Sequence, residues 1–235
     1  MRTALLALAL LAPLAPEALA QADAPLRPGD VDVSAVEPYV YEYRIHVVAP
    51  VQQVFGTATE TLTVEGGEAL SVVSIAGQGM SQTDSVSFAW PTLEPIRETS
   101  LANGAAQTFE FTGMGVAGVL RDGDAVDATF EAPVFASGAA DLIARAMLLD
   151  EGATAQIVSF DDDAPDTPVV TTITTTGQEE VLGRTAWIVT AVGGDNDVTY
   201  AFDAETGETL RVAFSPQPGV QIELRRMDLD AEKAK

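Results

Sequence analysis

The chain has 235 residues, no cysteine, one histidine and a formal net charge of −23 at neutral pH. The absence of cysteine excludes disulfides, thiolate metal sites and a lipid anchor attached through a cysteine. The acidic composition disfavours nucleic acid and anionic membranes as partners. It suits adaptation to high salt and a basic partner equally well, so by itself it identifies no site.

Residues 1–20 have the order of features that is typical of a cleavable signal peptide. Arg2 precedes an apolar stretch from Ala4 to Ala15, which is too short to span a membrane, and Ala18-Leu19-Ala20 matches the small-x-small cleavage pattern. No later apolar run approaches the ~18 residues of a membrane-spanning helix. We therefore expect cleavage near Ala20, no membrane span or lipid anchor, and a periplasmic or extracellular location.

The rest of the chain is expected to form one domain. Residues 21–36 are polar and rich in proline, which predicts a flexible leader. Residues 37–226 predict a single β-rich domain, and residues 227–235 predict a polar tail. A domain of this size can bury enough apolar surface to fold without disulfides or metals.

Alternation of apolar and polar residues predicts many strands. Between Tyr39 and Val47 the odd positions are Tyr, Tyr, Tyr, Ile and Val, which indicates one buried and one wet face and places His46 towards solvent. Turn signals such as Asn103-Gly104 separate the segments that follow. The further expected strands are 57–64, 70–76, 108–111, 126–131, 156–160, 169–176, 187–189, 198–202, 210–214 and 220–224.

One segment has helical spacing instead. Between Ser137 and Leu149 the apolar residues fall on one face, with Ser137 as the expected N-cap and Gly152 as the expected stop. We expect this helix to pack against the concave face of the sheet, with a surface lid as the alternative. The sequence thus predicts a mainly β fold, a strongly curved antiparallel sheet or open barrel of roughly ten or more strands closing on one short α-helix.

Two phrases of the sequence resemble each other. Residues Phe88 to Arg97 and Phe202 to Arg211 place Phe, Thr and Arg at the same offsets across an expected strand–turn–strand. An internal duplication explains the similarity, and so does the composition that hairpins share. The sequence leaves both explanations open.

The motifs that usually indicate chemistry are better explained by structure. Gly113, Gly115 and Gly118 fit the dinucleotide pattern GxGxxG, but a strand and a tight turn follow instead of the required helix, so the glycines indicate bending or close packing of the sheet. The acidic run from Asp161 to Asp166 lacks the ligand spacing of an EF-hand, and a solvated loop is simpler than a calcium site. A pair of catalytic carboxylates is compatible with so many acids, yet nothing selects one. We predict no catalytic residue, no metal and no cofactor.

The aromatic residues are the remaining candidates for a binding site. On the concave side of a curved sheet they would either fill a core or line a cavity for an apolar ligand. The residues expected to line such a cavity are Trp90, Phe109, Phe111, Phe130, Met147, Trp187, Tyr200 and Phe202.

The order of these segments resembles a family of exported bacterial domains of unknown function. The resemblance rests on the Tyr-rich first strand, the phrase from Trp90 to Pro95, the helical block from Pro133 to Leu149, and the phrase from Val181 to Val189. It also includes the phrase from Tyr200 to Arg211. The β-sheet plan of that family is similar to the lipoprotein-localisation carriers of the Gram-negative envelope. The resemblance implies a curved antiparallel sheet closing on a helix, a shape that holds acyl chains in the carriers.

Three hypotheses about function follow. The first is an exported, non-enzymatic envelope protein that binds a lipid-like or other apolar ligand in the concave face of the sheet. The second is a structural or adaptor domain with a solid core and a protein partner in the envelope. The third is a carboxylate-dependent hydrolase, which would need two acids with perturbed pKa values in a cleft.

Overall fold

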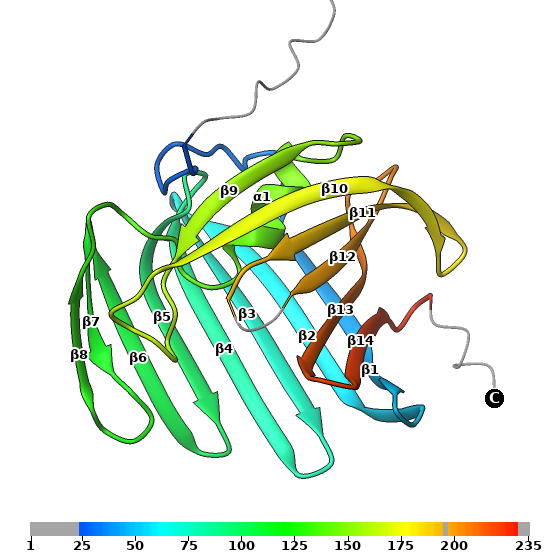
Figure 1. Ribbon diagram of the computed structural model, residues 1–235, viewed down its shortest axis with the longest axis horizontal. Helices are drawn as coiled ribbons and strands as arrows, with labels where there is room; N and C mark the ends of the chain where they lie inside the picture. The colour runs from blue at the N-terminus through cyan, green and yellow to red at the C-terminus, as the bar shows by residue number, and fades with distance from the viewer. Residues whose placement is uncertain (1–23, 195–196, 230–235) are drawn as a thin grey trace, which may run out of the picture.

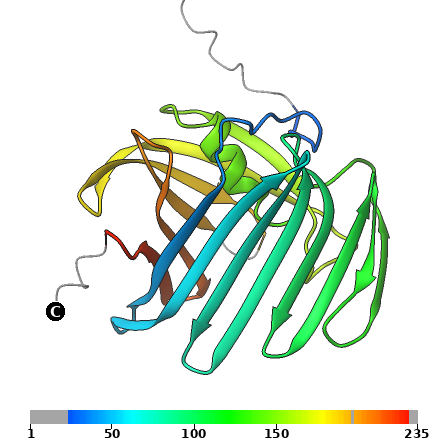
Figure 2. The ribbon, with the colours of Figure 1, turned by 180° about the vertical axis from the view of Figure 1, so that it is seen from behind.

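The computed structural model describes residues 24–194 and 197–229, so the predicted signal peptide lies outside the described residues. One 14-stranded antiparallel sheet curls around a single short helix, α1 (Ala139–Met147), as Figure 1 shows. The view from behind shows the same sheet from its other side (Figure 2). The predicted mainly β fold, a curved antiparallel sheet closing on one helix, is therefore confirmed.

The strands follow the chain in a regular up-and-down course. Along the sheet their order is β8-β7-β6-β5-β4-β3-β2-β1-β14-β13-β12-β11-β10-β9. Their bounds are β1 (Tyr39–Ala49), β2 (Gln53–Glu65), β3 (Glu68–Gly77), β4 (Met80–Ala89), β5 (Glu94–Ala102), β6 (Ala105–Thr112), β7 (Gly115–Val119), β8 (Ala125–Thr129), β9 (Thr154–Ser159), β10 (Val169–Val181), β11 (Arg184–Val192), β12 (Val198–Asp203), β13 (Thr209–Gln217) and β14 (Val220–Arg226).

The strand order divides the sheet into two six-stranded units with the same arrangement. The first unit is β1–β6 and the second is β9–β14, and they join where β1 pairs with β14. Strands β7 and β8 and helix α1 lie between the two units in the chain. The second unit curls back over the concave face of the first (Figure 1).

The hairpins β4–β5 and β12–β13 occupy corresponding places in the two units and share their local geometry. In each one a register shift falls at a fully buried phenylalanine, Phe88 or Phe202. Five residues further on, Leu93 and Gly207 both have a left-handed backbone, with φ of 54° and 72°. Each donates its backbone N–H to the carbonyl four residues earlier, at 3.0 and 2.8 Å. The similar phrases in the sequence therefore mark equivalent positions, which favours an internal duplication.

Helix α1 packs its apolar face against the inside of the curve. Leu142 and Ile143 are 1% and 0% exposed and belong to the main core. The expected N-cap is wrong: the residue preceding the helix is Gly138, and Ser137 instead donates its hydroxyl to Glu98 at 2.7 Å. Among the described residues no helix combines the length and the apolar character needed to cross a membrane.

The segment before β1 is part of the fold, which corrects the prediction of a flexible leader for residues 24–36. Val31, Val33 and Val36 are at most 5% exposed and contribute to the main core. Their three spaced apolar side chains outweigh the polar, proline-rich composition on which the prediction relied. Residues 21–23 lie outside the described residues, as do residues 230–235 of the predicted tail.

His46 is 5% exposed, so the expectation that it faces solvent is wrong. It lies at a register shift between β1 and β2, where Val54 and Arg225 of the neighbouring strands border the same small hollow. The register shift and the residues around this hollow leave little of His46 exposed, at a position that alternation alone treats as wet.

Gly118 in β7 shows why the glycine motif is structural. A β-carbon at this position would lie 2.1 Å from the carbonyl oxygen of Thr108 and 2.7 Å from the ring of Phe109. The absence of a side chain lets β7 approach its neighbour β6 closely at this point. The segment is a strand and not the start of a helix, as predicted.

Candidate functional site

Most of the predicted ligand-binding residues are packed into the main core beneath α1. The ring of Phe109, for example, meets that of Phe160 edge-on with centroids 4.8 Å apart. Trp187 pairs in register with Phe202 but is outside the residues that pack on this core. Their role in binding stays a prediction. Phe109, Phe111, Phe130 and Phe202 are at most 9% exposed, while Trp90, Met147 and Tyr200 are partly buried against the same core.

Beyond the helix, the concave face carries apolar side chains that remain partly exposed. Residues directly opposite each other on neighbouring strands point to the same face, and Tyr200 pairs with Val212, which pairs with Leu224. Leu224 in turn pairs with the buried Ile45 of β1. We call the partly exposed set the apolar inner wall. It consists of Phe55, Ile75, Val198, Val212, Phe214, Ile222 and Leu224.

A polar cluster separates this wall from the cavity described below. Glu60 of β2 accepts hydrogen bonds from the hydroxyls of Tyr39, at 2.5 Å, and Tyr43, at 2.9 Å. Burial raises the pKa of both tyrosines, and the negative charge of Glu60 raises it further. The carboxylate thus serves as the hydrogen-bond partner of two hydroxyls that water reaches poorly.

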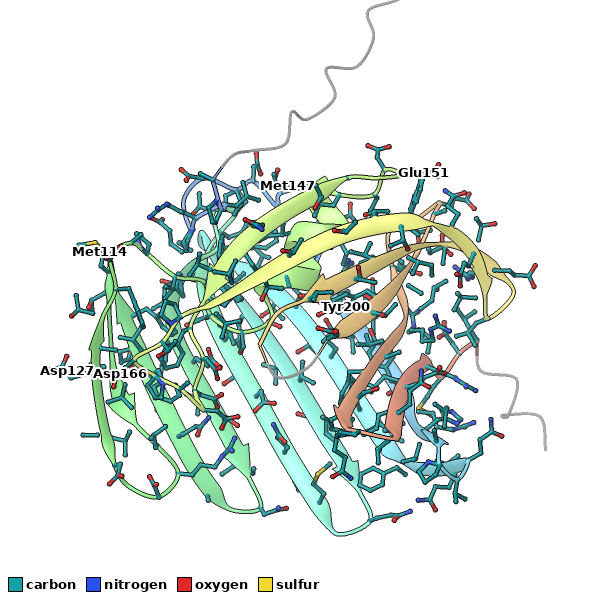
Figure 3. All side chains as sticks on the ribbon, viewed as in Figure 1. Met114, Asp127, Met147, Glu151, Asp166 and Tyr200 are labelled. Carbon is teal, nitrogen blue, oxygen red and sulfur yellow. The ribbon has the colours of Figure 1, made fainter. Side chains whose placement is uncertain are left out.

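Helix α1 adds a carboxyl and a guanidinium to the same cluster. Burial raises the pKa of Asp141 to about 7, and the negative charge of Glu60 adds to the increase, whereas Arg145 opposes it. Tyr200 of β12, labelled in Figure 3, is also close enough for the charge of Asp141 to raise its pKa further after burial. A single helix therefore brings two charged groups of opposite sign to tyrosines of β1 and β12.

Arg145 connects the helix to two strands of the sheet. Its Nε donates to the carbonyl of Gly207 at 3.1 Å, and its Nη2 donates to the hydroxyl of Tyr41 at 3.2 Å. Its guanidinium also lies over the ring of Tyr39, 4.4 Å from the centroid. Its Nη1 is buried and has no hydrogen-bond partner in the described part of the chain.

A polar cavity of about 620 Å³ lies at the end of the concave face where β1 begins. Arg145 and Arg226 contribute to its lining, and both guanidiniums lie against the ring of Tyr41, at 5.6 and 4.3 Å from its centroid. The turn between β12 and β13 and the residues before β1 close its sides. Glu37 and Glu208 also line it and supply negative charge.

A second, more apolar cavity of about 410 Å³ lies between the ends of β8 and β9, where the sheet is not closed by strand pairing. Phe130 and Val134 line it together with Val158 and Pro168. Phe130, one of the predicted ligand-binding residues, thus borders a cavity as well as the core.

The acidic run after β9 forms a loop, as expected. Asp162 accepts a hydrogen bond from Gln107 of β6, and the carboxylates of Asp161, Asp162 and Asp163 come within 4.8 Å of one another. Such a group of carboxylates offers oxygen ligands for a hard cation. Clusters of exposed acidic residues are also common in proteins where no metal ion is bound.

The sequence alone did not identify Glu60, Asp141 and Arg145 as a cluster. In the sequence Asp141 is one acid near the start of the expected helix, and Glu60 is one of many acids in an expected strand. The usable signal was the triple tyrosine of β1, whose hydroxyls need polar partners when the rings turn inward.

The fold and these features define a β-barrel-like domain, an incompletely closed sheet with one helix packed against its concave face. The chain belongs to the DUF3108 family, described as a protein of unknown function, whose family model matches residues 42–228. The predicted membership of a family of unknown function is thus confirmed, while the likeness to lipoprotein carriers stays a prediction. No curated protein matches this chain.

A solved structure supports the same fold. The chain is similar to the β-barrel-like protein of the domain of unknown function DUF1849 from Brucella abortus, with a TM-score of 0.55 and 11% sequence identity. The match covers 81% of this chain and 95% of that protein. At this identity the likeness shows the fold alone.

Proposed function

We propose that this protein is an exported, non-enzymatic binding protein that holds a lipid-like or other apolar ligand against the apolar inner wall. The observation that carries the proposal is the contrast within the concave face. Under α1 the aromatic side chains are buried, whereas Ile75, Val212 and Phe214 point into the same curve and stay partly exposed. Contiguous apolar surface left open to water is typical of a binding surface.

The residues of the apolar inner wall differ from the binding residues that the sequence predicts. Phe109 and Phe202 are fully buried among other side chains, so a ligand would have to displace the core to reach them. Tyr200 packs on the core and is paired with Val212 of the wall, so it lies where the two regions meet. An apolar ligand on the wall would contact Tyr200 without disturbing the helix.

The test is native mass spectrometry of the protein purified from its own cells, followed by loading with a fatty acid such as palmitate. We expect a bound apolar molecule in the wild-type protein and its loss in Phe214→Ser. The matched control is Leu70→Ser, because Leu70 is 43% exposed on the convex face. No co-purified ligand and no palmitate uptake would reject the proposal and favour the adaptor with a solid core, which crosslinking in the envelope would then pursue.

Export is a separate part of the proposal and rests on residues 1–20 of the sequence. Mass spectrometry of the intact protein from cell fractions tests it. We expect the chain to begin at Gln21 and to be recovered outside the cytoplasm. A chain that retains residues 1–20 in the cytoplasm would contradict export without affecting the ligand test.

The carboxylate-dependent hydrolase is supported least. Glu60 is held by two tyrosine hydroxyls, and Asp141 lies on the helix among the side chains that dock it. Both acids therefore have a structural explanation. Exchange of Asp141 for asparagine, described below, is expected to change stability and not an activity.

A further inference from the structure

We propose that the polar cavity lined by Arg145 and Arg226 binds a carboxylate group, as carried by a small organic acid or by the C-terminus of a peptide. The cavity lies at the opposite end of β1 from the apolar inner wall, with the fully buried Tyr43 between them. The proposal is therefore independent of the function proposed above. Its volume of about 620 Å³ lies within the range of small-molecule sites.

Two arginines offer hydrogen-bond donors to this cavity. A guanidinium has five N–H groups. Among the described residues Arg145 uses its Nε and one N–H of Nη2, and Nη1 has no partner. Arg226 donates Nε and Nη2 to Asp228 and Nη1 to the carbonyl of Thr209, so two of its N–H groups have no partner within residues 24–194 and 197–229. Both arginines therefore retain donors for an oxyanion.

The positive charge at the cavity comes from Arg145 and Arg226. Within the described residues Arg145 donates its hydrogen bonds to neutral oxygens, a carbonyl and a phenol, while the carboxyls of Asp141 and Glu60 are its nearby acidic groups. A second guanidinium, that of Arg226, lies against the same tyrosine ring. Arg226 is paired with Asp228, so a ligand carboxylate would be held through the N–H donors of the two guanidiniums that remain and not through an excess of positive charge.

The acidic residues that line the cavity bear on which anion it can hold. Glu208 lies 4.0 Å from Arg226 and 3.9 Å from Arg184, and Glu37 is exposed at the rim. The carboxylates of Glu37 and Glu208 would repel a dianionic ligand such as phosphate more strongly than a ligand that carries a single carboxylate charge. The planar fork of an arginine also matches the two oxygens of a carboxylate. The cavity therefore favours a monoanion.

The equivalent turn of the first unit is covered by chain, which supports the cavity as a place for a ligand. In the first unit the equivalent turn is covered by the chain before β1, where Gly29 and Val33 donate their backbone N–H groups to the carbonyls of Thr92 and Pro91, at 3.0 and 3.1 Å. In the second unit the corresponding turn, Thr206 to Glu208, borders the cavity. An extended peptide end would take a place that the first unit fills with its own chain.

The test is a calorimetric titration of the full chain with propionate, with its uncharged analogue propionamide and with inorganic phosphate. We expect propionate to bind more tightly than phosphate and propionamide not to bind. Arg145→Gln should weaken propionate binding by about tenfold or more, because a charge-assisted pair is lost. The matched control, Arg97→Gln, removes an exposed arginine paired with Glu110 and should leave binding unchanged.

A second variant keeps the proposal testable if Arg145→Gln does not fold. Glu208→Gln removes one negative charge from the rim and should tighten propionate binding by about threefold. Equal binding of propionate and propionamide, tighter binding of phosphate, or weaker propionate binding in Glu208→Gln would overturn the proposal. If tri-alanine binds more tightly than propionate and loses this binding when its C-terminus is amidated, the carboxylate comes from a peptide end. If propionate binds more tightly than tri-alanine, the carboxylate comes from a small organic acid.

Discussion

Leu93 and Gly207 occupy the same position in two equivalent hairpins, and both have a left-handed backbone, with φ of 54° and 72°. Only one of them is a glycine, for which this conformation costs nothing sterically. Leu93 is 0% exposed and belongs to the main core, whereas Gly207 lies at the polar cavity. The two units thus keep one backbone geometry while placing an apolar anchor in the first and a small residue in the second.

Exchanging these residues should separate strain from packing. Gly207→Leu is expected to lower the free energy of unfolding by about 1–2 kcal/mol, because a branched residue enters a left-handed backbone. Leu93→Gly relieves a similar strain but removes a fully buried side chain, so a net loss of about 2 kcal/mol is expected. Urea unfolding measures both. A neutral Gly207→Leu would show that the turn is not constrained as in the structure.

Asp141 should make stability depend on pH. Its pKa rises from the ordinary 3.8 to about 7 in the folded protein, so between these values the folded form holds a proton that the unfolded chain has lost. Stability is therefore expected to fall as the pH rises from about 4 to about 7 and to change no further through this group above that window.

Comparison with Asp141→Asn isolates that contribution. The difference in unfolding free energy, variant minus wild type, should increase between about pH 4 and pH 7, because asparagine cannot ionise. Asp150→Asn, at an exposed position just after the helix, is the control and should show no such trend. A constant difference for Asp141→Asn across the window would contradict the raised pKa.

Substitution of Glu60 should lower the stability of the fold more than substitution of most other polar residues. Glu60→Ala leaves the hydroxyls of Tyr39 and Tyr43 without their acceptor, and two unsatisfied hydroxyls predict a loss of about 2–4 kcal/mol. Glu60→Gln keeps one acceptor oxygen and should cost less. Glu65→Ala, on an exposed part of the same strand, should stay within about 0.5 kcal/mol of wild type by thermal and urea unfolding.

Gly118 should not accept even the smallest side chain. Gly118→Ala places a β-carbon 2.1 Å from a backbone carbonyl of β6, which forces the two strands apart and should cost about 1–3 kcal/mol. Ala117→Val adds more volume on the exposed face of the same strand and serves as the control. Equal unfolding midpoints for the two variants would show that the strands do not approach as closely as described.

Much of the sheet could be predicted from the sequence because one face of each strand is buried. The tyrosines of β1 and the alternation in β12–β14 are clear in the sequence, and these strands form as expected. Strand β4 was not predicted over its first half, because Gln82 and Asp84 point inward where an apolar residue would reveal the pattern. The N-cap was misplaced because Ser137 finds a buried carboxylate, Glu98, contributed by a strand that is distant in the chain.

The sequence by itself determined that this protein is acidic, free of cysteine and built mainly of strands. Charge and cysteine content follow from composition, and the period-two alternation of strands is a local property of the residue order. Only the tertiary structure decided which aromatic side chains form the core and that Arg145 and Arg226 line one cavity. It also decided that Glu60 and Asp141, among the many acids of the chain, lie beside the buried tyrosines. These decisions depend on the pairing of β1 with β14 and on the docking of one helix, which bring together residues more than a hundred positions apart.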